Sequence, residues 1–193
     1  MTEYLAPWRT VLQRALHRNR SQVFSRYFQL ATIDTEGKPS NRTVVFRGFV
    51  DGTNNLKIVT DTRSEKFTHL QHNPHVEICW YFTKTREQFR LQGTIDLITF
   101  ENEANQELRQ QAWSKLSQNA QKQFFWGDPA EPLTEDSFDV SDFAESAPAI
   151  DNFCLLIFNP THIDHLELRG DPQNRCIYSL NDDRSWSQQE VNP

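Results

Sequence analysis

Apolar residues recur at two different periods along this chain, and the change of period separates a first helix from the strands that follow. Near the N-terminus the apolar positions lie three or four residues apart, which is helical spacing. These positions are Leu5, Trp8, Val11, Leu12, Ala15 and Leu16. We therefore expect residues 1–20 to form an amphipathic helix that closes the domain.

From residue 27 onward, apolar and polar positions alternate, which is typical of half-buried β-strands. The pattern predicts strands at residues 27–33, 40–49, 56–60, 75–82 and 87–99, separated by turns rich in Gly, Pro, Asn and Asp. Gly93 lies inside the last of these, where a glycine is typical of a β-bulge.

A short helix is expected between the third and fourth of these strands. Thr62 and Glu65 have the spacing of a capping box, and Ser64 offers a second N-cap. Pro74 then ends the helix.

The second half of the chain combines helices, a long loop and further strands. Helices are expected at residues 101–117 and 121–126, and strands at 153–158, 163–168 and 175–180. Residues 128–151 hold eight acidic residues, no Lys or Arg and three prolines, which predicts a mobile loop or lid inserted into the domain. Strands in hairpins with flanking helices predict an α+β, mainly antiparallel β-barrel, with residues 1–193 as one domain.

The distribution of charge points to an anionic ligand in the first third of the chain. The whole chain has 20 Lys and Arg against 26 Asp and Glu, a formal charge of −6, which argues against a nucleic-acid or anionic-lipid partner. Residues 1–66 reverse this balance, with 11 basic residues against six acidic ones.

Cysteine usage and the N-terminal pattern predict a cytoplasmic protein without a membrane span. Cys79, Cys154 and Cys176 are widely spaced and form no Cys-x-x-Cys pair, so neither a disulfide framework nor a zinc site is expected. Arginines interrupt every apolar stretch near the N-terminus, and no run of 18 apolar residues occurs.

Three histidines at three-residue spacing, His69, His72 and His75, raise the alternative of a metal site. Pro74 breaks the helix before the third histidine, and no Cys or carboxylate completes a ligand set. We therefore expect solvated histidines and no bound metal.

The segment from Thr60 to Lys66 joins a strand end to a helix N-terminus, where free N–H groups and the helix dipole favour a phosphate. Ser64 can add a hydroxyl donor, while Lys66 and Arg42 can add positive charge. Alternation places Arg42 and Arg47 on opposite faces of their strand unless a bulge intervenes. The same residues also fit a plain surface strand and a capped helix, so the pattern alone leaves both interpretations open.

Four segments together resemble the pyridoxamine 5′-phosphate oxidase-like family, and in particular its FMN-binding, oxidase-related branch of uncertain substrate. They are Arg42-Thr-Val-Val-Phe-Arg47, Val59-Thr60, Ser64-Glu-Lys66, and Asn73-Pro74 before an aromatic strand. The similarity runs from about residue 22 to 181, with the acidic stretch as an interruption. It implies a split β-barrel that forms a homodimer with FMN at the subunit interface.

The resemblance also implies which residues contact FMN. Arg42 and Lys66 would hold the phosphate, with Ser64 assisting, and Arg175 would come from the second subunit. The remaining contacts would be made by strand residues, namely Thr43, Val44, Val45, Arg47, Val59, Thr60 and Gln88.

Departures from the family pattern fall mainly on the substrate side. Glu65 stands where the oxidase has a second phosphate-binding Arg, and Leu166 replaces a flavin-stacking Trp. Trp113, Ser117 and Gln121 take the places of the Tyr, Arg and Ser that hold the substrate's phosphate, and residues 171–174 contain no Arg-x-His pair.

Without a cationic anchor the oxidase's phosphorylated substrate is disfavoured, because charge-assisted hydrogen bonds to a dianion are lost. We therefore expect an FMN-dependent oxidoreductase with an altered substrate site. A non-catalytic flavin- or haem-binding split barrel is the alternative.

Overall fold

The computed structural model describes residues 5–145 and 147–193, and most of their regular structure is antiparallel β-sheet. The strand order is β2-β1-β4-β5-β6-β7-β8, and β3 pairs separately with β6. Their bounds are β1 (Tyr27–Ile33), β2 (Pro39–Val45), β3 (Leu56–Asp61), β4 (His75–Phe82), β5 (Glu87–Ile98), β6 (Phe153–Glu167), β7 (Asn174–Leu180) and β8 (Trp186–Val191). The predicted α+β, mainly antiparallel class is confirmed.

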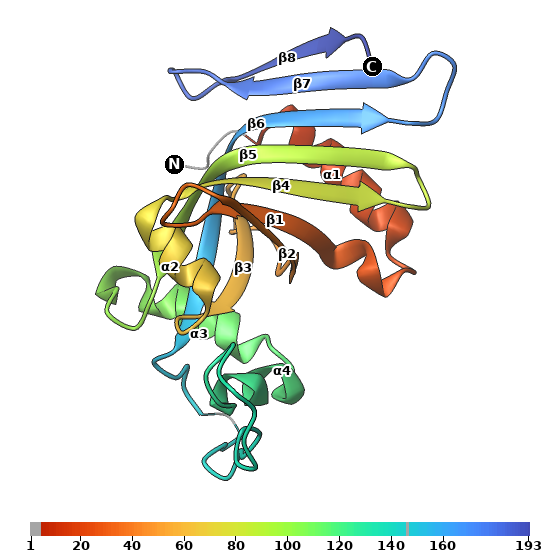
Figure 1. Ribbon diagram of the computed structural model, residues 1–193. Coiled ribbons are helices and arrows are strands. Elements are labelled where there is room, and N and C mark those ends of the chain that lie inside the picture. Colours follow the sequence, from red (N-terminus) through yellow and green to blue (C-terminus); the bar gives the residue numbers. More distant parts are fainter. Residues whose placement is uncertain (1–4, 146) are drawn as a thin grey trace.

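Helices cover the sheet and its ends (Figure 1). They are α1 (Pro7–Asn19), α2 (Glu65–His72), α3 (Gln106–Ser114) and α4 (Gln118–Lys122), with 3₁₀ turns η1 (Val23–Arg26), η2 (Glu103–Asn105) and η3 (Gln123–Phe125). α2 lies at the end of the sheet where β4 begins, opposite the turn between β4 and β5 (Figure 1). α1 packs along one face of the sheet through Trp8, Leu12 and Ala15, all fully buried.

The first six residues of β6 are buried on both faces of the strand, and this explains the continuous apolar run there. Cys154, Leu156 and Phe158 belong to the core beneath α1, while Phe153 and Leu155 belong to a second core with α3. Since successive side chains of a strand point to opposite faces, a strand between two cores needs apolar residues at every position.

Gly93 marks a bulge, as predicted. The register between β5 and β6 shifts between Gln92 and Gly93, which pair with His162 and Pro160. A Cβ on Gly93 would lie 2.1 Å from the carbonyl oxygen of Asn159. Only glycine fits at this position. The strand β6 continues through the bulge, where the alternation of the sequence predicted two separate strands at 153–158 and 163–168.

Other boundaries also differ from the sequence prediction. β2 ends at Val45 instead of residue 49, because Gly48, with φ of +103°, turns the chain away from the sheet. α2 begins at Glu65 with Ser64 at its N-cap, so Thr62 lies outside the helix and forms no capping box. β8 was not predicted, since this exposed edge strand is polar throughout its middle.

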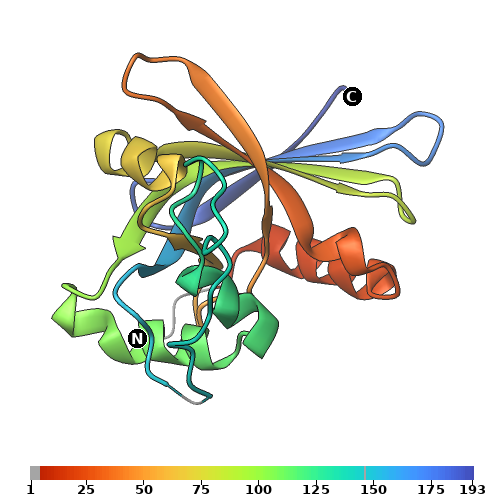
Figure 2. The same ribbon diagram turned by 60° about the horizontal axis from the view of Figure 1, so that its bottom comes forward.

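The acidic stretch 128–151 forms no helix or strand in its described residues. The last part of the stretch is hydrogen-bonded to α3. Trp113 Nε1 donates to the Ala147 carbonyl at 2.9 Å, and Ala149 N donates to Gln110 Oε1 at 2.8 Å. Figure 2 shows its first part running from α4 toward α2. Its predicted mobility stays a prediction.

Within the described ranges, none of the helices is both long and apolar enough to cross a membrane.

Candidate functional site: a cationic pocket at the start of α2

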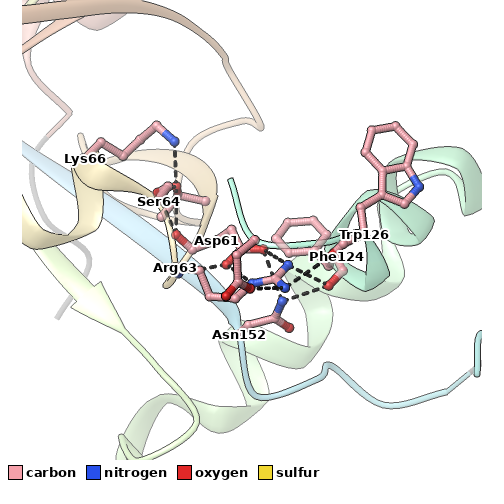
Figure 3. A network of polar contacts seen from close by, with 9 residues as sticks. Asp61, Arg63, Ser64, Lys66, Phe124, Trp126 and Asn152 are labelled. Carbon is pink, nitrogen blue, oxygen red and sulfur yellow. Dashed lines mark hydrogen bonds and ion pairs between the residues drawn. The ribbon is translucent and has the colours of Figure 1, made fainter. Parts of the chain in front are cut away.

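The turn from β3 into α2 is organised by a chain of hydroxyl contacts. Ser64 Oγ donates to the Asp61 carbonyl at 2.7 Å and lies 3.1 Å from Thr60 Oγ1. Lys66 Nζ donates to the same Thr60 hydroxyl at 3.0 Å (Figure 3). The Ser64 side chain accepts no hydrogen bond from the first amides of α2. Those amides are therefore free of side-chain capping at the site of the predicted phosphate.

Arg42 reaches the same region from β2, and its guanidinium is fixed by β1 and its own strand. It donates to Thr32 Oγ1 and Ser40 Oγ, each at 2.7 Å, and to the Leu30 carbonyl at 3.2 Å. Burial lowers the pKa of Arg42, because it removes water molecules that would otherwise solvate the charged guanidinium.

Arg42 and Lys66 are two half-buried cations that repel one another. Burial lowers the pKa of Lys66, and the charge of Arg42 lowers it further, while Asp61 and Glu65 oppose this. In the part of the chain that the structure describes, neither cation forms an ion pair. A bound anion would relieve this repulsion.

A cavity of about 220 Å³ lies at these cations. Arg42, Ser64, Glu65 and Lys66 line one side, and Pro129 and Ala130 of the acidic stretch line the other. Its size and donors suit a phosphate group.

The other predicted FMN contacts on the flanking strands differ in how far their side chains are exposed. Val44 and Thr60 are buried, Val45 and Val59 are half-buried, and Thr43 is exposed.

Arg47 lies apart from the pair of cations. Burial lowers the pKa of Arg47, and the charge of Arg26 lowers it further, while Tyr27 opposes this. Its Nε is buried without a hydrogen-bond partner in the structure.

Gln88 and Arg175 lie in one row across the sheet, opposite Leu166 of β6. Gln88 also pairs with Tyr81 near the end of β4, whereas α2 leads into His75 at its start. Six residues of strand span about 20 Å. One chain therefore does not bring Gln88 and Arg175 to the Arg42–Lys66 pair.

Arg175 is engaged within its own chain. Its Nε and one terminal nitrogen donate to the two oxygens of the buried Asp164, at 2.9 and 2.8 Å. Arg90 donates to Asp164 as well, at 2.6 Å. The sequence analysis missed Asp164 and Arg90, because their meeting depends on the register of three strands.

The three predicted substrate residues lie on or beside α3 and α4, and their polar groups bind within the chain. Trp113 is buried against the second core. Gln121 Nε2 donates to the Trp113 carbonyl at 3.0 Å, and the Ser117 hydroxyl caps α4. None of them lines the cavity at Arg42 and Lys66. Their role in substrate binding stays a prediction.

Possible metal ligands gather elsewhere among the described residues, at Glu87, His165 and Glu167. His165 Nε2 lies 3.1 Å from Glu87 Oε2, and Arg14 approaches Glu167 at 3.8 Å, so both carboxylates of the cluster already have polar partners. Of the three histidines noted in the sequence, His69 contacts Thr32 Oγ1 at 3.0 Å.

Comparison with known proteins places this chain in a family. Residues 5–99 match a family model described as the FMN-binding domain of pyridoxamine 5′-phosphate oxidase. A protein of Arabidopsis thaliana named pyridoxine/pyridoxamine 5′-phosphate oxidase 2 is 36% identical over 200 residues, covering all of both chains. This chain belongs to the pyridoxamine 5′-phosphate oxidase family.

Two solved structures share the fold. A pyridoxamine 5′-phosphate oxidase-related, FMN-binding protein of Nostoc punctiforme PCC 73102 is 49% identical, covers 98% of each chain and superposes with a TM-score of 0.93. PhzG of Burkholderia lata 383, at 18% identity over the whole of both chains, has a TM-score of 0.76, which shows a common fold alone. The predicted split-barrel fold is confirmed, and FMN is the cofactor of the domain.

Proposed function

We propose that this protein is an FMN-dependent oxidoreductase whose flavin phosphate is held by Arg42 and Lys66. The observation that carries the proposal is the pair of half-buried cations without an ion-pair partner among the described residues. A phosphate dianion supplies the missing negative charge, and each charge-assisted hydrogen bond to it contributes about 1.5–3 kcal/mol.

The neighbouring groups fit this assignment. The hydroxyls of Ser64 and Thr60, which already contact one another, can turn toward a phosphate oxygen. Glu65 stands in the place of a second Arg of the family, and it attracts both cations without forming an ion pair with either in the described structure. The proposed phosphate site therefore has fewer positive charges than that of the family. When bound, FMN supplies hydride-transfer chemistry, and the protein supplies binding, orientation and electrostatic tuning.

A homodimer would complete the flavin site. Gln88 and Arg175 lie at the other end of β4 and β5 from α2, too far to join Arg42 and Lys66 within one chain. In a dimer, the second copy of the chain can place the corresponding end of its own sheet beside this site. We therefore propose that Arg175 reaches the flavin of the partner subunit.

We propose that the substrate differs from pyridoxamine 5′-phosphate. The name of the Arabidopsis relative points to that substrate, whereas Trp113, Ser117 and Gln121 offer no cation for a second phosphate. Turnover assays with pyridoxamine and pyridoxine 5′-phosphates decide between the two. Steady oxidation of either ester by the FMN-loaded protein would contradict the altered substrate.

A cytoplasmic location is proposed on the basis of the cysteines. Cys79, Cys154 and Cys176 are all free thiols, as is usual in a reducing compartment.

Flavin titration tests the proposed function. Wild-type protein should bind FMN and quench its fluorescence, and Arg42→Ala or Lys66→Ala should each weaken binding by about 1.5–3 kcal/mol. Lys38→Ala is the matched control, since this exposed lysine pairs only with Glu36 in the described structure. A wild-type protein that takes up no flavin would contradict the proposal, and a haem spectrum would favour the alternative.

A further inference from the structure

A second and larger cavity, of about 670 Å³, lies beside the phosphate pocket. Its one wall is the turn from β3 into α2, and its other wall is the segment 123–138. The two cavities share only Lys66 and Pro129 among their lining residues. The larger one thus adjoins the proposed flavin site, with which it shares Thr60 and Lys66, while Arg63 and residues 131–134 and 136–138 line the larger cavity alone.

Arg63 holds the two walls of this cavity together (Figure 3). Its Nε and one terminal nitrogen bind both oxygens of Asp61, at 2.9 and 2.7 Å. The remaining bonds reach Asp128 Oδ1 at 2.9 Å and the carbonyls of Trp126 and Phe124 at 3.0 and 3.1 Å. All five N–H donors of the guanidinium are used, so the cavity is preformed.

Apolar side chains are left exposed on the wall of this cavity. Trp126, Leu133 and Phe138 are 36%, 75% and 58% exposed, and all three line it. The rings of Trp126 and Phe138 meet edge to face at 5.3 Å. Since large apolar groups gain free energy when they are removed from water, a ligand with an apolar body would be stabilised here.

The charge of the cavity is negative. Arg63 pairs with both Asp61 and Asp128, so its single positive charge balances only one of these two carboxylates, and Glu131 and Asp136 form no side-chain hydrogen bond or ion pair within the described ranges. Lys66 is the other cation of the lining, and a phosphate in the adjoining pocket would neutralise it. Two free carboxylates repel an anionic ligand and attract a cation.

We propose that this cavity binds a small organic cation with an aromatic body. The ammonium group would lie near Glu131 and Asp136, and the ring would pack against Trp126 and Phe138. An aromatic face also attracts a cation directly, which adds to the effect of the carboxylates. This binding site goes beyond the proposed flavin chemistry and does not require flavin to be present.

Three aromatic compounds of similar size but different charge test the proposal by calorimetric titration of the wild-type protein. Phenethylamine is cationic at neutral pH, 2-phenylethanol is neutral and 3-phenylpropionate is anionic. The amine should bind about tenfold more tightly than the alcohol, because two exposed ion pairs contribute about that much affinity. The acid should bind most weakly of the three. Equal affinities for the three, or no saturable binding of the amine, would overturn the proposal.

Matched variants locate the binding. Glu131→Gln with Asp136→Asn should reduce the affinity for phenethylamine to that for 2-phenylethanol, and should leave the alcohol unaffected. Glu101→Gln with Asp182→Asn makes the same change of charge at two exposed positions outside the cavity and should change nothing. If both double variants weaken the amine equally, general electrostatic attraction explains the binding and the proposed site is wrong. FMN titration of the same variants, expected to match wild type, keeps this test separate from the flavin proposal.

Discussion

Lys66 combines a proposed role in phosphate binding with a cost to the stability of the fold. Its ammonium group is half-buried and repelled by Arg42, which holds its pKa below the ordinary value. Groups poised in this way favour a ligand of opposite charge and destabilise the empty site.

Lys66→Met should therefore stabilise the flavin-free protein by about 0.5–1 kcal/mol while weakening FMN binding. The folded protein binds fewer protons at Lys66 than the unfolded chain does, so wild-type stability rises as pH increases toward the ordinary lysine pKa. The advantage of the variant should shrink over the same range. Urea unfolding at several pH values measures this, and a variant less stable than wild type at every pH would contradict it.

At the scale of single residues, the sequence predicts which chemical groups are present better than it predicts which residues they contact. The positions of Ser64 and Lys66 at the start of a helix could be predicted, because a polar turn before a helix is a local pattern. Arg63 lies in the same motif, yet its partners Trp126 and Asp128 are more than sixty residues away. No local signal predicts such contacts.

At the scale of elements, the strands with clear alternation were predicted well. β1 and β4 have the expected bounds, whereas the bulge at Gly93 joins two expected strands into β6. β8 was missed because its exposed residues are polar on both faces. A strand is thus predictable where one face is buried, and less so at an edge or between two cores.

Asp164 couples three strands, and its charge should be measurable in the stability of the sheet. Hydrogen bonds from Arg175 lower its pKa, burial opposes them, and Arg90 adds to the lowering. The resulting stability is present above the ordinary Asp pKa and is lost as pH falls through the lowered folded-state value.

Asp164→Asn should lower the free energy of unfolding by about 2 kcal/mol at neutral pH, and by less below about pH 4, where the unfolded carboxyl is protonated. Denaturant unfolding at both pH values checks this. Asp182→Asn, at an exposed position in the turn between β7 and β8, serves as control. A loss that is independent of pH would show that the charge of Asp164 contributes nothing.

For the whole molecule, the separation of Gln88 and Arg175 from Lys66 predicts complementation between subunits. The native mass should be twice the chain mass of 22.7 kDa. Lys66→Ala and Arg175→Ala homodimers should each bind FMN weakly. A refolded mixture should regain about half the sites in its heterodimers, because one site then has both residues intact. If no binding returns on mixing, Arg175 does not act across the interface.

The acidic stretch changes the meaning of the net charge. Residues 128–151 hold eight of the 26 acidic residues, so the rest of the chain has 20 bases against 18 acids. The sequence located this charge, but the fold was needed to show that its first part lies against the basic turn, where it lines both cavities.

The central claim is that Arg42 and Lys66 bind the phosphate of the flavin. Parallel titrations of the wild-type protein with FMN and with riboflavin, which lacks the phosphate, test it most directly. Two charge-assisted contacts predict that FMN binds at least a hundredfold more tightly, the fold-change for about 3 kcal/mol, and that Arg42→Ala with Lys66→Ala abolishes this preference. Equal affinity of the wild-type protein for FMN and riboflavin would contradict the claim.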